Sequence, residues 1–450
     1  MNVKKKIRMW WLRLDIFAHD HYWLFWLGLF IFARLLVIFL PGPGYSDVTH
    51  YYERYANTWH YGLPPYTHSV FEYGPLAALA IYLPLRVDLA GIGQYYINYK
   101  FLSFLVELLA FAMLVSYQKK RHQGRTFPLL LYVILTSLAK NWLYEGIDVI
   151  FSSLAIMSLL ALELPTKWRD YLSWLLLWAS TAVKFLTLPL IVPFYLLTRK
   201  KFLPSLLMIA LTFTLVWGGP LLYYRSSLSV PFVYNSGRTI KYNTITHLII
   251  RTLNNVTHTE VQSEEAPDYS FSGPKSTVAA HILTWLYPLS LAMILLAQGL
   301  YIHYLETGKF LDKPDKMWSR LLQPSPLDTH TRTQTATWCY LTYFLVSFFT
   351  AKIYSNPFLL WLLPLLIIIE WQNQKREHWF YGLMSLWTIL ELTPFLTAGF
   401  WHLQSYSWFS FYEGFETTYA WVKWGVMLAV VCLVWREFVA KSGAKINQHL

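Results

Sequence analysis

Long apolar runs recur from residue 22 to residue 435 and constrain the fold of this chain more than any other feature. Many approach the roughly 20 residues that an α-helix needs to cross about 30 Å of hydrocarbon. Of the 450 residues, 55% are hydrophobic and only 14% are charged, which is too apolar for a soluble protein of this size. Only helices and closed barrels satisfy their backbone groups in lipid, and runs of this length indicate helices. We therefore expect one all-α polytopic membrane domain over residues 1–450.

The placement of basic residues predicts the orientation of the chain. The formal net charge is +12, which in a soluble protein would suggest a nucleic-acid partner, but here the cations cluster between apolar runs. The clusters lie at 4–13, near 120, at 167–169, 198–201, 308–320 and 373–378, and in the C-terminal tail. By the positive-inside rule they mark cytoplasmic segments. We expect a cell-membrane protein with both termini cytoplasmic, an uncleaved first span and no nucleic-acid partner.

The runs predict about 12 transmembrane helices. The expected spans are 22–40, 96–117, two that flank an outer turn at 139–148, two short helices within 171–198, and then 202–224, 281–303, 336–351, 357–371, 380–399 and 419–435. The run 171–198 has cations at both ends, so a single helix would place one cluster outside. A hairpin that turns near Lys184 keeps both clusters inside, and we prefer it.

Two large outer loops follow from this topology, at 41–95 and 225–280. Long ordered loops of membrane enzymes and other proteins usually carry the function. Within the first loop, residues 72–91 are apolar but too short and too charged at their end for a span, so we expect a helix lying in the outer interface.

Asp47 stands directly after the first apolar run, in the segment "GYSDVTHYYERY". An Asp after Pro-Gly is a preferred helix N-cap, and the residues that follow have a helical pattern. The other interpretation is a general base at the outer membrane boundary, beside His50 and several aromatic residues. The segment alone is compatible with both.

Lys184 and Lys352 interrupt apolar runs at their predicted outer ends. A Lys near the centre of a span costs about 2.5 to 3.5 kcal/mol, so such a residue usually faces a partner or a wet cavity. Snorkelling of the long side chain towards the interface is the simpler explanation for either lysine alone. Together with Arg238 and Lys241 of the second outer loop, they can line a pocket for an anionic group such as phosphate.

Other charged residues give weaker signals. Lys100 and Glu107 are seven residues apart on one helical face, which predicts a structural ion pair. Asp148 is either a second acidic substrate-binding residue or the cap of the next helix. His402 is a candidate for substrate binding or an interfacial side chain, and Glu391 has no evident partner.

Neither a metal site nor a cofactor site is evident in the sequence. The two cysteines, Cys339 and Cys432, lie in apolar runs, so they indicate neither a disulfide framework nor a zinc site. No glycine-rich phosphate loop or nucleophile elbow occurs at a usable spacing. An outward-facing enzyme without a nucleotide needs a donor already activated on a lipid, which points to a polyprenyl-phosphate sugar.

Several segments resemble motifs of the GT-C superfamily of polytopic glycosyltransferases. They are "SDVTHYYERYANTWHYGLPPY", "FEYGPLAALAIYLPL", "KFLSFLVE", "STAVKFLTLPLIVPFYLLTRKK" and "KIYSNPFLLWLLP". The pattern is most similar to glycosyltransferase family 87, the polyprenol-phosphate-mannose-type mannosyltransferases, and to the catalytic subunit of GPI mannosyltransferase I. It covers residues 22–370.

The resemblance implies a GT-C fold and an inverting hexosyl transfer, of mannose in the nearest families, from polyprenyl phosphate to a lipid or cell-envelope glycan acceptor on the outer face. It implies Asp47 as the catalytic base. Val48 stands where some members have a second carboxylate, which disfavours a two-acid metal site. The residues expected to hold the donor phosphate are Lys184, Lys352, Arg238 and Lys241, and those expected to shape the acceptor side are His50, Tyr66 and Glu72.

Two other classes of function stay open. A transporter or flippase for lipid-linked sugars also needs aromatic walls and embedded cations, although such proteins commonly contain paired internal repeats, which this sequence lacks. An oligosaccharide polymerase or a membrane acyltransferase is the second alternative. An acyltransferase would normally place a catalytic His inside a span, and the expected spans contain histidines only near their edges, such as His281 and His303.

Overall fold

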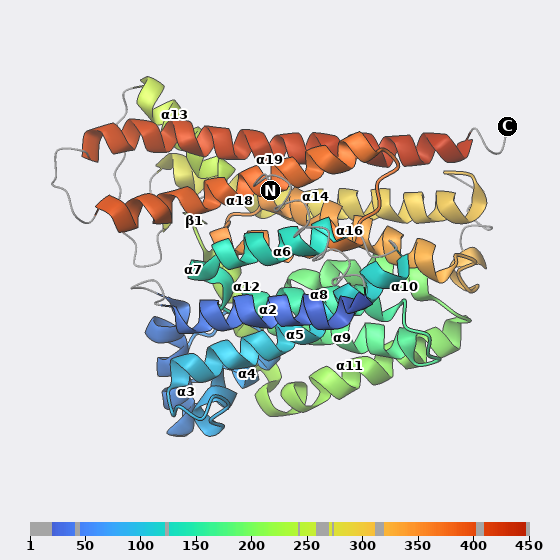
Figure 1. The fold of residues 1–450 in the computed structure, drawn as a ribbon, viewed down its shortest axis with the longest axis horizontal. Helices are drawn as coiled ribbons and strands as arrows, with labels where there is room; N and C mark the ends of the chain where they lie inside the picture. The colour runs from blue at the N-terminus through green and yellow to red at the C-terminus, as the bar shows by residue number, and fades with distance from the viewer. Residues whose placement is uncertain are drawn as a thin grey trace, which may run out of the picture.

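The computed structural model describes residues 20–40, 46–121, 126–241, 244–257, 270–271, 274–310, 319–401 and 409–446. The regular structure in these residues is helical apart from one small antiparallel sheet, in which Ile240 pairs with Phe271 and Lys241 with Ser270. The long helices lie side by side along the longest dimension of the molecule (Figure 1). The all-α prediction is confirmed.

The first part of the chain forms the lower layers of the bundle in Figure 1. Its elements are α2 (Tyr22–Phe39), η1 (Val48–Tyr52), α3 (Glu53–His60), α4 (Pro75–Arg86), α5 (Tyr95–Arg121), α6 (Phe127–Leu138), α7 (Lys140–Leu143), α8 (Asp148–Ala161), α9 (Arg169–Val183), η2 (Phe185–Leu190), α10 (Ile191–Thr198), α11 (Phe202–Tyr224), η3 (Arg225–Ser229) and α12 (Val230–Gly237).

Most of the remaining elements form the upper layers in Figure 1. The remaining elements are β1 (Ile240–Lys241), α13 (Ile245–Thr257), β2 (Ser270–Phe271), α14 (Pro274–Thr307), α16 (Thr329–Thr350), η4 (Asn356–Trp361), α17 (Leu365–Ile368), α18 (Gln374–Trp401) and α19 (Phe409–Ile446). Among them, η4 and α17 instead pack against α8, α5 and α6.

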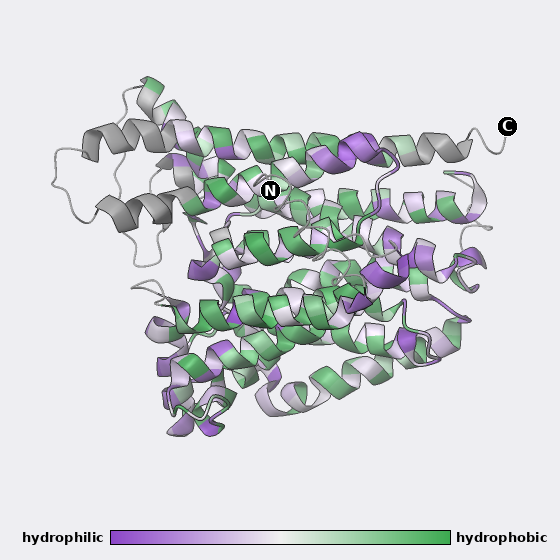
Figure 2. Ribbon diagram, in the orientation of Figure 1, coloured by the Kyte–Doolittle hydropathy of each residue, from purple (hydrophilic) through white to green (hydrophobic). Residues whose placement is uncertain are grey.

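Five helical stretches of the described chain are long and apolar enough to cross a membrane: Tyr22–Phe39, Tyr95–Arg121, Phe202–Gly237, Thr277–Thr307 and Thr418–Phe438. Five shorter apolar helices accompany them, at Pro75–Arg86, Phe127–Leu138, Asp148–Ala161, Phe185–Thr198 and Pro357–Ile368. Hydrophobic residues cover the middle of the long helices, and hydrophilic residues gather at helix ends and in loops (Figure 2). These features support a membrane protein, whereas the number of 12 spans and the GT-C fold stay predictions.

The hairpin predicted within 171–198 is present. Helix α9 ends at Val183, Lys184 has an extended backbone with φ −135° and ψ 127°, and η2 and α10 then lead back. The Nζ atom of Lys200 lies 3.0 Å from Oδ2 of Asp170. Both ends of this apolar region therefore lie at the same end of the bundle.

The two ends of the bundle differ in their charges. At one end, here called the basic end, Arg121, Arg199, Lys200 and Arg376 form ion pairs with acids of neighbouring helices. Lys119 lies over the ring of Tyr22, which brings the start of α2 to this end as well. Helices α3, α7 and α12 and strand β1 lie at the opposite end (Figure 1).

Helix α8 forms the centre of the bundle. Each of its residues except Leu154 is buried, because α5, α9, α16 and η4 surround it. A helix that is apolar on all faces can bury all of them only in such a central position. Since Asp148 is its first residue, the core of the protein fixes the place of that carboxylate.

The predicted ion pair between Lys100 and Glu107 is wrong. Glu107 pairs with Arg34 of α2, whose NH2 atom lies 2.8 Å from Oε1, while Lys100 pairs with Glu145, with Nζ 2.8 Å from Oε1. Seven residues advance a helix by about 10 Å, so the two side chains share a face but cannot meet. Each charge instead takes a partner from a neighbouring segment.

Candidate functional site

The loop "YEGID", residues 144–148, joins α7 to α8 at the end opposite the basic end. This loop is held by two parts of the bundle, α5 and η1. The hydroxyl of Tyr144 donates to Glu107, and Glu145 binds Lys100. The backbone N–H of Ile147 donates to the hydroxyl of Tyr52, 3.2 Å away. These contacts with α5 and η1 fix the position of the loop, and the loop forms the floor of the candidate site.

Asp148 and Lys184 form a buried ion pair next to this floor. Oδ1 of Asp148 accepts from Nζ of Lys184 at 2.6 Å and from Nε1 of Trp361 at 2.8 Å. The ammonium group also lies over the rings of Tyr73, Phe358 and Trp361, with Nζ 5.1 Å from the centroid of Trp361. The charge of Lys184 is therefore already balanced, and Asp148 is more than a helix cap.

Asp47 lies beside the same loop. A Cβ atom built on Gly146 would be 3.4 Å from Oδ2 of Asp148 and 3.7 Å from Oδ2 of Asp47, so the two carboxylates converge on this glycine. The Asp47 side chain makes no capping hydrogen bond to η1. Instead, Oγ of Ser46 accepts from the N–H of Thr49 at 3.2 Å. Ser46 thus serves as the cap, and the half-buried Asp47 carboxylate has no hydrogen-bond partner among the described residues.

The surroundings of Asp47 favour its protonated form. The pKa of Asp47 is raised from 3.8 to about 6. Burial makes the largest contribution, the negative charges of Asp148 and Glu72 add to it, and Lys241 and Lys184 oppose it. A carboxylate that titrates in this range can accept a proton near neutral pH.

The predicted phosphate-binding cations fall into two groups. Lys184 and Arg238 already have acidic partners, and the Arg238 NH1 atom lies 2.6 Å from Oε2 of Glu72. Lys241 and Lys352 have no acidic partner in the described chain. Nζ of Lys352 donates to the backbone oxygen of Ser236, at 3.1 Å.

Lys241 and Lys352 are joined through the backbone, since the N–H of Lys241 donates to the carbonyl oxygen of Lys352 at 3.0 Å. Burial lowers the pKa of the Lys241 ammonium group, and the positive charge of Arg238 lowers it further. An anion bound here would relieve that unfavourable charge, so these two lysines are the residues best placed to bind one.

The other predicted substrate-binding residues have structural contacts. His50 lies on η1, and its Nδ1 atom is 3.2 Å from the carbonyl oxygen of Ser46. Tyr66 is buried with a positive φ of 69°, and its hydroxyl donates to the carbonyl oxygen of Tyr73 at 2.9 Å. It therefore supports the ring on which Lys184 lies. His402 is outside the described residues.

Gly74 fixes the first outer loop to the site, which the sequence did not indicate. Its N–H donates to the carbonyl oxygen of Val183 at 3.0 Å, directly before Lys184. A Cβ atom on Gly74 would lie 2.3 Å from the carbonyl oxygen of Ala182. The glycine of "EYGPL" is therefore required for this close approach of two backbones.

Tyr52 and Trp361 also belong to the site and were not predicted from the sequence. Both are fully buried, and burial keeps the pKa of Tyr52 well above its ordinary value, so its hydroxyl stays neutral. The only available signal was the abundance of aromatic residues in the two segments that contain them. Which of these rings reaches the carboxylates depends on the packing of η1 and η4 against α8.

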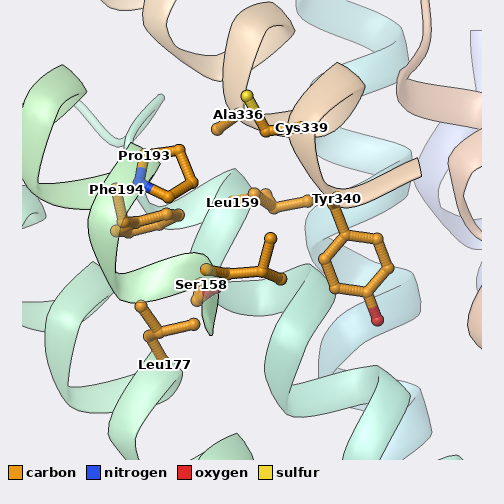
Figure 3. Close-up of a pocket in the computed structure, with 9 residues that line it drawn as sticks. Ser158, Leu159, Leu177, Pro193, Phe194, Ala336, Cys339 and Tyr340 are labelled. Carbon is orange, nitrogen blue, oxygen red and sulfur yellow. The ribbon is translucent and has the colours of Figure 1, made fainter. Parts of the chain in front are cut away.

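No group of three or more His, Cys, Asp or Glu side chains suited to a metal ion occurs in the part of the chain that the structure describes. A small cavity between α8, α9, α10 and α16 is lined almost entirely by carbon, including Leu159, Phe194 and Cys339 (Figure 3). Leu159 is about three helical turns beyond Asp148 on α8, so this cavity is separate from the carboxylates. It offers no charged group for chemistry.

Comparison with known proteins gives no family for the chain, because no family model matches it and no curated protein matches it.

Proposed function

We propose that the protein is a GT-C-type inverting glycosyltransferase of the cell membrane. In this proposal it moves a sugar, taken as mannose, from a polyprenyl-phosphate carrier to a lipid or cell-envelope glycan acceptor on the outer face. The observation that carries the proposal is the carboxylate of Asp47, which has no hydrogen-bond or ion-pair partner among the described residues and a pKa raised to about 6. It lies within the electrostatic reach of Lys241 at one end of an apolar helix bundle.

The proposed reaction is a single displacement. The acceptor hydroxyl oxygen forms a bond to the anomeric carbon, and the bond between that carbon and the phosphate oxygen breaks. Asp47 takes the hydroxyl proton, and the polyprenyl phosphate leaves with the bonding electron pair. No enzyme nucleophile is needed, in contrast to a retaining glycosidase with its two carboxylates. The reaction therefore needs one base and a site for the departing negative charge.

The lysines supply that site. Lys241 and Lys352 are the proposed donor-phosphate ligands, since neither forms a salt bridge with an acid among the described residues. The charges of Glu72 and Asp47 favour the ammonium form of Lys241 without pairing with it directly. Charge that develops on the phosphate in the transition state is stabilised by cations already in place. Lys184 has a supporting role, because its pairing with Asp148 prevents a second uncompensated carboxylate beside Asp47.

The orientation follows from the charges at the two ends. The basic end is proposed to face the cytoplasm, in agreement with the positive-inside rule, and the carboxylate site to face the other side. A nucleotide-linked donor would be confined to the cytoplasmic side, whereas a lipid-linked donor can reach a site at the outer leaflet.

The proposal is tested by sugar transfer in membranes that contain the wild type, Asp47→Asn or Glu53→Gln. Radiolabelled polyprenyl-phosphate mannose is the donor and membrane lipids are the acceptors. Asp47→Asn is expected to lose at least about 100-fold in rate, the usual contribution of a general base. Glu53 is an acid of the same loop, on α3, and its variant should keep the wild-type rate.

Transfer by Asp47→Asn at the wild-type rate would show that the base assignment is wrong. A wild type that translocates the lipid-linked sugar without transferring it would support the transporter instead.

A further inference from the structure

Glu391 is a buried acid on α18 that the proposed reaction does not use. It is 1% exposed. Its Oε1 atom accepts from the hydroxyl of Tyr354 at 2.7 Å and from Nε1 of Trp387 at 3.1 Å. Oε2 lies 3.4 Å from Nζ of Lys423 on α19. Burial of a carboxylate in an apolar bundle costs free energy unless the carboxylate is paired. The contacts of Glu391 offset this cost and also hold their partners in place.

Tyr354 connects the cluster to the candidate site. It lies in the linker 351–355 between α16 and η4, whose ends at Ala351 and Ser355 have extended backbones. This linker also contains Lys352, two residues earlier. Its two ends join the flanking helices, since the N–H of Ala351 donates to Ser347 and the carbonyl oxygen of Ser355 accepts from Phe358. The position of residues 352–354 between them depends on contacts made by their side chains and backbone.

Two sets of contacts hold the linker from opposite directions. On the side of the second outer loop, the carbonyl oxygen of Lys352 accepts from the N–H of Lys241 at 3.0 Å. On the side of the C-terminal helices, the fully buried Tyr354 ring packs on Trp424, with centroids 5.3 Å apart, and under Nζ of Lys423, 5.4 Å from its centroid. Its hydroxyl donates a hydrogen bond to Oε1 of Glu391.

We infer that Glu391 is a positioning residue for the phosphate-binding lysines. Its hydrogen bond holds Tyr354 in position. Through the linker, Tyr354 then sets the position of Lys352, and also that of Lys241, whose N–H is hydrogen-bonded to the linker backbone. The inference rests on the proposed function for the identity of the anion as a lipid phosphate. It assigns α18 and α19 a part in donor binding, although neither contributes a described residue to the site itself.

The test compares Glu391→Gln and Tyr354→Phe with Glu437→Gln. Glu437 is a matched control, because it is also a buried acid in a cation pair, with Arg376 at 2.7 Å, but lies at the basic end. Loss of a hydrogen bond to a charged group changes an equilibrium constant by about 10-fold or more. We expect Glu391→Gln and Tyr354→Phe to raise the KM for polyprenyl-phosphate mannose about 10-fold, with a smaller change in kcat. Glu437→Gln is expected to change the Tm but not this KM.

A second measurement does not depend on turnover. Ile353→Cys, next to Lys352, is labelled with a maleimide in a background in which the exposed Cys432 is replaced by Ala. Polyprenyl phosphate without sugar should slow labelling. In Glu391→Gln, about a 10-fold higher concentration of polyprenyl phosphate should be needed for the same protection.

Three results would overturn the inference: unchanged KM and protection in Glu391→Gln, a loss of Tm alone, or no protection in the parent Ile353→Cys protein. Protection without sugar transfer would instead count against the proposed function and leave the positioning role of Glu391 supported.

Discussion

At the scale of single residues, two aspartates beside Gly146 have opposite surroundings. Asp148 is neutralised by Lys184 and held by Trp361, whereas Asp47 is unpaired among the described residues and has a raised pKa. A carboxylate with a raised pKa beside a second, ion-paired carboxylate is typical of sites in which the first one transfers protons. The capping interpretation of Asp47 fails for a local reason, because Ser46 provides the cap.

The pKa of Asp47 predicts an acid limb in the pH profile. Only the ionised carboxylate can accept a proton, and its pKa of about 6 lies above the ordinary value of 3.8. Activity should therefore be full above this pKa and fall as the pH decreases through about 6. Glu72→Gln removes a negative charge that raises this pKa and releases Arg238, so the limb should move to lower pH.

Measurement of kcat/KM against pH for the wild type, Glu72→Gln and Glu53→Gln checks this shift, since kcat/KM reports groups of the free enzyme. The Glu53 variant should keep the wild-type limb. A limb that moves upward in Glu72→Gln would contradict the electrostatic argument.

At the scale of elements, the site depends on how helices begin and end. Helix α4 begins with Pro75 directly after Gly74, and α9 ends at Val183 directly before Lys184. The two ends meet through the hydrogen bond from the N–H of Gly74 to the carbonyl oxygen of Val183. The first outer loop is thereby positioned against the break that carries the lysine.

Gly74→Ala is expected to disrupt this junction. The added Cβ atom would lie 2.3 Å from the carbonyl oxygen of Ala182, and its nearest neighbours are backbone atoms of Ala182, so one backbone must shift. Overpacking of this kind costs about 1–3 kcal/mol and should also displace Lys184. The Tm and the rate of sugar transfer should both decrease. Gly28→Ala on α2 is the control, since nothing lies within 4 Å of its Cβ position; equal Tm values for the two variants would rule out the predicted clash.

At the scale of the whole molecule, the bundle separates charge between its ends. The basic end joins α5, α8, α9, α10, α14, α18 and α19 through its ion pairs. The other end brings together Asp47, Asp148, Lys184 and Lys241 from segments far apart in the sequence. Helix α5 has 27 residues and so separates the ends by about 40 Å, enough to place them on opposite faces of a bilayer.

This arrangement predicts which cysteines an impermeant thiol reagent reaches in oriented vesicles. In a Cys432→Ala background, Lys167→Cys and Lys201→Cys should be labelled from the same side, because the hairpin returns the chain to the basic end. Tyr61→Cys, at a position that is 81% exposed, should be labelled from the opposite side. Labelling of residues 167 and 201 from different sides would mean that 171–198 crosses the membrane once, contrary to the structure.

The sequence by itself determined the helical class and one of the turns between helices, whereas the span expected at 357–371 is divided in the structure between η4 and the short helix α17. Run length predicts a spanning helix because its backbone hydrogen bonds are local and lipid offers no others. The hairpin at Lys184 followed from cations at both ends of one run, and α4 from an apolar segment too short to span. These features depend on residues that are close together in the chain.

Only the tertiary structure decided which charges meet. Glu107 binds Arg34 rather than Lys100, Lys184 binds Asp148, and Glu391 binds Tyr354. These partners are on different helices, and their meeting depends on how each helix is rotated and displaced against its neighbours. The apolar pattern leaves that rotation open where a helix such as α8 is buried on all sides. Close packing in three dimensions therefore pairs Asp148 and leaves the neighbouring carboxylate of Asp47 without a partner among the described residues.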